Sequence, residues 1–257
     1  MHGEYFEYEP PPELAPYVEC YWTSVATPEA APHLVFPDGC ADILFSRTAA
    51  EGEQLRVIGV MTQHRAINST AGDLYFGVRF RPAMASSFLA LPGDLLTDQV
   101  ISLDLIWGPA ARRLLEEIGN TESIPGRIGA LERHLKSQPN LSSVQRAMSW
   151  MVARHGQISI DDLARAAGLS ARQFRRRSVQ ETGLTPKQLS RVIRFRHTVS
   201  QLWIKRPSDW AQFALDCGYY DQAHLINEFR EFSGSTPVSY AEGSASPIDG
   251  RNGTIGP

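Results

Sequence analysis

The sequence repeats itself near its C-terminal end with an offset of 51 residues. A helix-capping residue, an apolar residue, a glycine and a proline fall in register at the pairs 170/221, 174/225, 183/234 and 186/237. A short alanine-containing segment ending in glycine, at Gly168 and Gly218, precedes each copy. Helix, glycine turn and capped helix is the pattern of a helix-turn-helix. The repeat therefore predicts two such units, reading two adjacent major-groove windows from one chain.

The charge distribution supports this interpretation. The net charge is −3, but residues 1–140 carry 10 basic and 18 acidic residues, and residues 141–257 carry 15 basic and 10 acidic ones. A basic half joined to an acidic half favours nucleic-acid binding by the basic half. The three cysteines, Cys20, Cys40 and Cys217, are scattered, which favours a reducing compartment. Without a signal core or an apolar segment of membrane-spanning length, we expect a cytoplasmic protein.

The predicted fold class is α+β. Residues 17–25, 41–46, 55–60 and 74–80 are rich in β-branched and aromatic residues between turn signals, which predicts a barrel- or sandwich-like domain. Helices are expected over 82–90, 108–118 and 124–136. The domain division is then 1–136 for this β-rich domain, 137–140 for a linker, 141–240 for the tandem helix-turn-helix domain, and 241–257 for a disordered tail.

Capping signals divide residues 141–240 into helices. Ser159 begins one helix and Gly168 ends it, and Ser170 and Gly183 bound the next. Thr185 and Pro186 begin a helix that runs to about Lys205. At about 1.5 Å per residue, this helix is about 30 Å long, close to the roughly 34 Å between successive major-groove faces.

The two capped helices supply the candidate DNA contacts. The first presents four arginines, of which three share one face, and polar residues at its start: Ser170, Arg172, Gln173, Arg175, Arg176 and Arg177. Arginine reads guanine and clamps phosphate. The second presents Gln222, His224, Ile226 and Asn227, which suit adenine and the thymine methyl group. The alternative for the arginines is a solvated face or an ion pair with Asp161 or Asp162.

Residues 141–240 resemble the C-terminal domain of AraC/XylS-type transcription regulators, through the segment from Ala214 to Pro237 and its earlier copy. The resemblance implies sequence-specific binding to promoter or operator duplex, and admits RNA polymerase and a second copy of the chain as further partners. Ser178 departs from the family pattern, which usually has Phe there, as the second copy has at Phe229. On this symmetry, Ser178→Phe is expected to be tolerated.

The N-terminal half more loosely resembles an uncharacterised sensor-like domain found in many AraC-type regulators. Control by a small-molecule effector or by dimerisation is therefore expected. Candidate effector contacts are Trp22, Phe36, Phe45, Arg79, Arg81 and Trp107, with a purely structural core as the alternative for the aromatic residues and a salt-bridged face for the arginines.

We expect no cofactor, no metal site and no catalytic residue. His33, Asp38, Cys40, Asp42 and His64 are metal-ligand types, but their spacing matches no standard site. The alternative function is a metal-dependent enzyme domain fused to DNA-targeting helices.

Overall fold

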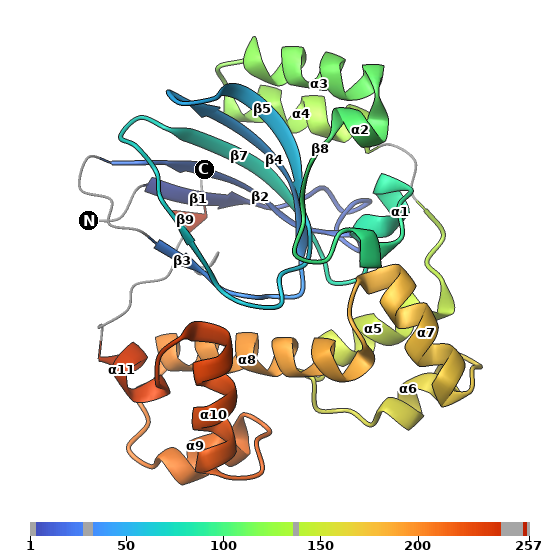
Figure 1. Ribbon diagram of the computed structural model, residues 1–257, viewed down its shortest axis with the longest axis vertical. Coiled ribbons are helices and arrows are strands. Elements are labelled where there is room, and N and C mark those ends of the chain that lie inside the picture. The colour runs from blue at the N-terminus through green and yellow to red at the C-terminus, as the bar shows by residue number, and fades with distance from the viewer. Residues whose placement is uncertain (1–3, 28–32, 136–138, 243–253, 256–257) are drawn as a thin grey trace.

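The computed structural model describes residues 4–27, 33–135, 139–242 and 254–255. It has a β-rich N-terminal region, above the long helix in Figure 1, and a helical C-terminal region. The predicted α+β class is confirmed. None of the helices in the described part of the chain is long and apolar enough to cross a membrane.

The N-terminal region is built on an open seven-stranded sheet in the order β8-β5-β4-β7-β2-β1-β9. The four predicted strands are β2 (Val18–Val25), β4 (Ala41–Thr48), β5 (Gly52–Ile58) and β7 (Leu74–Phe80). Strands β1 (Glu4–Tyr8), β8 (Val100–Ser102) and β9 (Thr254–Ile255) complete the sheet. A second sheet pairs β3 (His33–Val35) with β6 (Arg65–Ile67). The large sheet does not close into a barrel, and the sandwich-like alternative fits.

Side chains alternate along each strand, so successive residues lie on opposite faces of the large sheet. Phe76, Val78 and Phe80 of β7 are completely buried on one face, which α3 (Pro109–Gly119) and α4 (Ile124–His134) cover in Figure 1. Tyr75 and Arg79 of β7 alternate with them and point to the other face. The remaining short helices are α1 (Ala85–Leu89), the 3₁₀ turn η1 (Gly93–Leu95) and α2 (Asp104–Trp107).

The helical region contains the predicted duplication. Helix α5 (Ser143–Ala153) precedes α6 (Ile160–Ala166) and α7 (Ala171–Thr182), and the second unit contains α9 (Trp210–Asp216), α10 (Gln222–Ser233) and α11 (Pro237–Ala241). Helix α8 (Pro186–Ile204) joins the units, as predicted. Gly183 and Gly234 end α7 and α10 with φ values of 81° and 73°, a conformation that glycine adopts without strain.

Three residues of the predicted tail, 241–257, lie in regular elements of the structure. Ala241 ends α11, and Thr254–Ile255 form β9, which pairs in parallel with Phe6 and Glu7 of β1. β9 thus forms the edge of the large sheet and satisfies backbone groups of β1 that would otherwise be exposed at that edge. Residues 243–253 and 256–257 lie outside the described residues, as do 137 and 138 of the predicted linker. The boundaries of the domain division stay a prediction.

The N-terminal region packs on the first helix-turn-helix unit and on α8. Ser86 and Thr97 donate hydrogen bonds of 2.9 Å to the carbonyls of Glu181 and Gly183 at the end of α7. A Cβ on Gly93 would lie 2.5 Å from the backbone nitrogen of Gly183, so the two backbones touch there. Gln145 of α5 donates to the Ala83 carbonyl at 2.9 Å.

Ser178 is completely buried, and its hydroxyl donates to the Leu184 carbonyl at 2.8 Å. In the second copy, Phe229 and Ser235 stand at the equivalent positions. The two units therefore place the small and the large residue at opposite positions. The first unit has Ser178 and buried Leu184, and the second has Phe229 and Ser235. This pairing reverses the expectation that Ser178→Phe is tolerated.

We now predict that Ser178→Phe lowers the free energy of unfolding by about 1–3 kcal/mol through overpacking. Ser178→Ala, which removes only the hydrogen bond, should cost about 0.5–1.5 kcal/mol. The double variant S178F/L184S recreates the pair of the second copy and should recover part of the loss in urea unfolding. A higher melting temperature for Ser178→Phe alone would contradict this account.

Candidate nucleic-acid interface

Helix α7 presents its arginines to solvent. Phe174 and Ser178 face the core, whereas Arg172, Arg175, Arg176 and Arg177 are exposed. The side chains of Arg172, Arg175 and Arg176 have no hydrogen bond and no ion pair within 4 Å among the described residues. Asp162, one of the acidic partners considered above, pairs with Arg165 at 2.8 Å instead. A concentration of positive charge on the exposed face of one helix suits binding to a phosphate backbone.

Two of the candidate contacts also hold the start of α7. The Ser170 hydroxyl accepts a hydrogen bond from the Gln173 backbone at 3.3 Å, and the Gln173 side chain accepts one from the Ser170 backbone at 3.0 Å. This reciprocal capping box satisfies backbone donors that a helix start leaves free. Ser170 and Gln173 therefore fix the start of the helix that carries the arginines, and their direct contact with DNA stays a prediction.

The candidates on α10 differ in their surroundings. Gln222 and Asn227 are exposed, and Ile226 is half-buried. His224 is held locally, because its Nδ1 accepts from the Tyr220 backbone at 3.3 Å and its ring meets Tyr219 edge-on at 5.2 Å. Of the four candidates, Gln222 and Asn227 are the exposed ones, and their contact with bases stays a prediction.

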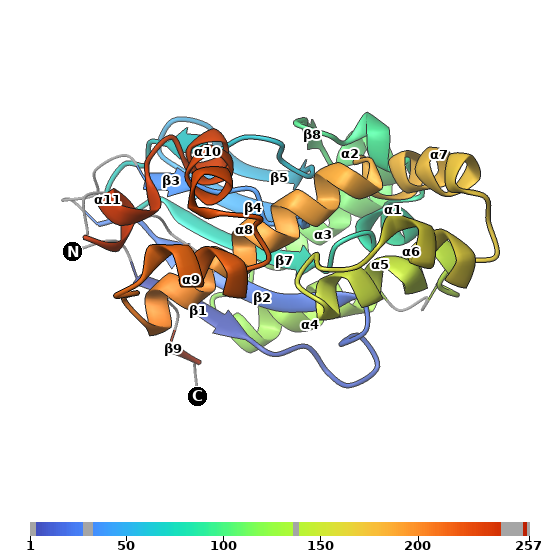
Figure 2. The same ribbon diagram turned by 90° about the horizontal axis from the view of Figure 1, so that it is seen from below.

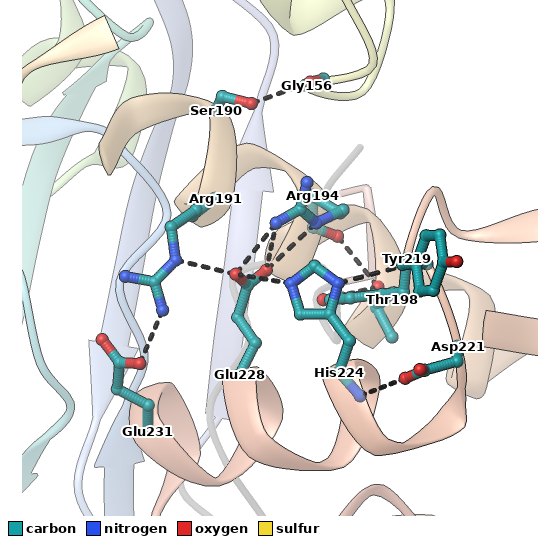
Figure 3. Close-up of polar contacts among 11 residues, drawn as sticks. Gly156, Ser190, Arg191, Arg194, Thr198, Tyr219, Asp221, His224, Glu228 and Glu231 are labelled. Carbon is teal, nitrogen blue, oxygen red and sulfur yellow. Dashed lines mark hydrogen bonds and ion pairs between the residues drawn. The ribbon is translucent and has the colours of Figure 1, made fainter. Parts of the chain in front are cut away.

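A charged network joins α10 to α8 (Figure 3). Glu228 is 3% exposed and accepts hydrogen bonds from Arg191 at 2.7 Å and from Arg194 at 2.8 and 2.9 Å. Arg191 also donates to Glu231, and this hydrogen bond is the main cause that raises the pKa of Arg191. Arg194 lies over the ring of Tyr219 at 4.8 Å, and burial raises the pKa of that tyrosine. The network fixes the second recognition helix against the joining helix.

Sequence reasoning missed this network. The available signal was Glu228, a carboxylate beside the inward-facing Phe229 and three residues after the inward-facing Leu225. A carboxylate on the inner face of a helix needs a partner, and Arg191 and Arg194, three residues apart on α8, were the candidates.

The joining helix sets the spacing of the two recognition helices. Nineteen residues make α8 about 28 Å long, at about 1.5 Å per residue. In Figure 2, α7 and α10 lie at opposite ends of α8 and along the same edge of the helical region. The entry of α7 and α10 into successive major-groove faces stays a prediction.

The candidate effector residues do not form one group. Trp22 and Arg79 line a cavity of about 190 Å³ in the N-terminal domain. Arg81 donates to the Ala15 carbonyl at 2.8 Å and, with Arg79, lines a cavity of about 610 Å³ beside α8. The other three aromatic residues pack on neighbours: Phe45 in the core, Phe36 against Phe195 at 5.6 Å, and Trp107 over His134 at 6.4 Å.

The metal-ligand residue types do not gather into a site. Within residues 4–27, 33–135, 139–242 and 254–255, no three His, Cys, Asp or Glu side chains are placed to hold a metal ion. Asp38 and Asp42 face Arg79 instead, at 3.6 and 3.4 Å. Their arrangement is that of a salt-bridge cluster.

Comparison with known families gives two matches. Residues 163–243 match the model of a helix-turn-helix domain, and residues 6–102 match a domain of unknown function, DUF6597. No curated protein matches the chain.

Several solved structures are similar. The DNA-binding domain of the global transcriptional factor AdpA, in complex with a target DNA, is 26% identical, with 40% of this chain and 93% of that one covered and a TM-score of 0.36. A transcriptional regulator with an AraC-type DNA-binding domain from Chromobacterium violaceum is 26% identical over 41% of this chain and 94% of that one, with a TM-score of 0.37. ToxT from Vibrio cholerae is 11% identical over 88% of this chain and 93% of that one, with a TM-score of 0.44.

The C-terminal match covers α7, α8 and α10. These helices contain the exposed arginines and the Glu228 network, and α8 sets the distance between α7 and α10. The N-terminal match begins within β1 and ends with β8. The chain therefore combines a helix-turn-helix domain over residues 163–243 with an N-terminal DUF6597 domain over residues 6–102.

Proposed function

We propose that this protein binds specific promoter or operator sequences by placing α7 and α10 in two successive major-groove windows, and that its N-terminal domain controls this binding in response to a small molecule. The observation that carries the first part is the pair of capped recognition helices on one edge of α8, one of them with exposed arginines that have no partner among the described residues. Base contacts from both helices then supply specificity, and arginine contacts to phosphate supply affinity.

The contact between the two domains supports the regulatory part. The N-terminal domain touches the last turn of α7 through Ser86 and Thr97, away from the arginines of the first turns. It also touches α8 between the two units, where a Cβ on Gly39 would meet Leu189 and Ile193 at 3.0 and 3.3 Å. A shift of the N-terminal domain would therefore change the relative placement of α7 and α10 without covering the arginines. Dimerisation through the N-terminal domain is the alternative means of control.

Selection of bound duplexes from a random pool tests this proposal. We expect one enriched sequence, bound at least about 1,000-fold more tightly than random DNA at physiological salt. The affinity for both should fall steeply with salt, because arginine contacts release condensed counterions. Equal binding of the enriched and the random duplex would contradict sequence-specific regulation.

A further inference from the structure

A cavity of about 190 Å³ lies on the face of the large sheet opposite α3 and α4. Its floor depends on Gly77, because a Cβ there would lie 2.7 Å from the Trp22 ring. The Trp22 indole on β2 therefore lies against Gly77 on the neighbouring strand β7. Tyr5 stacks on Trp22 at 5.9 Å, Tyr75 adds a third aromatic side chain, and the short β3–β6 sheet contributes Val35 and Ile67. The walls are mainly apolar, and a planar ring fits such walls well.

The polar end of the cavity offers acceptors more readily than donors. Trp22 Nε1 donates to Asp42 at 3.0 Å, and Arg79 faces Asp42 at 3.4 Å and Asp38 at 3.6 Å. These donors are already directed at carboxylates. Arg65, the other cation that lines the cavity, donates to the Asp98 carbonyl and lies 4.0 Å from the Asp98 carboxylate. Burial raises the pKa of the Asp42 carboxyl, and the Arg79 charge opposes that shift. An anionic ligand would meet two carboxylates, whereas a ligand with a hydrogen-bond donor would find oxygen acceptors.

The same end of the cavity belongs to the contact with α8. Asp38 and Arg79 also line the cavity of about 610 Å³ beside α8. This ion pair therefore lies between the two cavities. The segment Phe36–Cys40 carries Asp38 and packs on α8: Phe36 meets Phe195 edge-on at 5.6 Å, and Cys40 Sγ lies 3.6 Å from Arg196. A ligand that contacts Asp38 would act on the segment that touches the joining helix.

We propose that the 190 Å³ cavity binds a small ring compound that carries a hydroxyl or amino donor and no negative charge, and that occupancy changes DNA affinity through the Phe36–Cys40 segment on α8. The cavity is smaller than the roughly 300–1,000 Å³ of a site for a drug-sized ligand, so one ring with a short substituent is the matching size. The inference rests on the proposed function, of which it names the ligand class and the route of control.

Three single-ring probes of matched size test the ligand class: benzylamine, phenol and benzoate, titrated into the full chain and followed by two-dimensional NMR. We expect benzylamine and phenol to bind at least tenfold more tightly than benzoate. Ser24→Trp fills the cavity and should abolish binding, whereas Val25→Trp, on the opposite face of the same strand, should not. The absence of binding by benzylamine and phenol, tighter binding of benzoate, or equal binding in both variants would overturn the proposed ligand class.

The route is tested by DNA affinity at saturating benzylamine. The unmodified chain should change its affinity for the enriched duplex at least fivefold. Gly39→Ala should still bind benzylamine but lose this change, because its Cβ meets Leu189 and Ile193. Gly52→Ala is the matched control: both glycines have positive φ, 81° and 70°, but nothing lies within 4 Å of a Cβ at Gly52.

The possible outcomes distinguish failure of the proposed route from failure of the proposed function. Unchanged DNA affinity in the unmodified chain, or the same response in Gly39→Ala and Gly52→Ala, would overturn the route while sequence-specific binding stands. Failure to prefer the enriched duplex without any probe would instead contradict the proposed function itself.

Discussion

Replacing Arg172 or Arg175 with alanine should weaken binding to the enriched duplex by about 1–3 kcal/mol each, and relax the preference at one or two base pairs. Both side chains are exposed on α7 and have no hydrogen bond or ion pair with the described residues, so the change removes a DNA contact and no internal one. Equilibrium binding to the enriched duplex and to single-base variants of it measures both effects. If the replaced arginine contacts phosphate instead, the variant should bind all duplexes more weakly by the same factor, and the slope of its salt dependence should fall by about 1.

Arg165→Ala is the matched control for charge. Arg165 lies on α6 with its side chain 76% exposed and is paired with Asp162 at 2.8 Å. Its removal lowers the net charge by the same amount without touching α7, so base preference should be unchanged. Loss of base preference in Arg165→Ala as large as in Arg172→Ala, or unchanged binding in both α7 variants, would show that α7 does not read bases.

Glu228→Ala should lower the free energy of unfolding by about 3–5 kcal/mol, the usual cost of removing one partner from a buried ion pair. Glu228 is 3% exposed and accepts from two arginines, of which Arg194 is only 13% exposed. Its loss leaves positive charge without its partner between α8 and α10. Urea unfolding followed by circular dichroism measures the change, and DNA affinity should fall with it because α10 loses its fixed position on α8.

Glu231→Ala provides the comparison on the same helix. Glu231 pairs with Arg191 at 2.5 Å, but its side chain is 53% exposed, and exposed pairs contribute about 0–1 kcal/mol. A loss in Glu228→Ala no greater than that in Glu231→Ala would contradict the structural role of the buried network.

The helical half of the fold could be predicted closely because its signals are local. Ser170 and Thr185 are capping residues followed three positions later by glutamine, and Gly183 ends α7, so helix boundaries are encoded within a few residues. The repeat then doubles each signal. The inward side of α7 was equally predictable, since Phe174 is its main apolar residue.

The sheet was less predictable because its short strands depend on distant partners. Strands β3, β6 and β8 have three residues each, and such segments form only where a neighbouring strand satisfies their backbone groups. Strand β5 begins at Gly52, before the predicted residue 55, because its polar start pairs with Arg47 and Thr48 of β4. No local pattern carries that information.

Contacts between distant segments were also out of reach. The approach of Gly93 to Gly183 and the packing of Gly39 on Leu189 join residues about 90 and 150 positions apart. Arg79 illustrates the same limit at the candidate site. The sequence placed it on a strand face with two alternatives, and only the cross-strand pairing with Asp42 determines its partner.

A hydroxyl-radical footprint on the enriched duplex tests the central claim most directly, because it locates both recognition helices at once. We expect one chain to protect two windows on one face of the DNA, about one helical turn, or 34 Å, apart. Arg172→Ala should weaken protection in one window, and Asn227→Ala should weaken it in the other. Protection of a single window would contradict the claim that one chain reads two adjacent major-groove sites. So would two windows whose protection falls equally in Arg172→Ala and in Asn227→Ala.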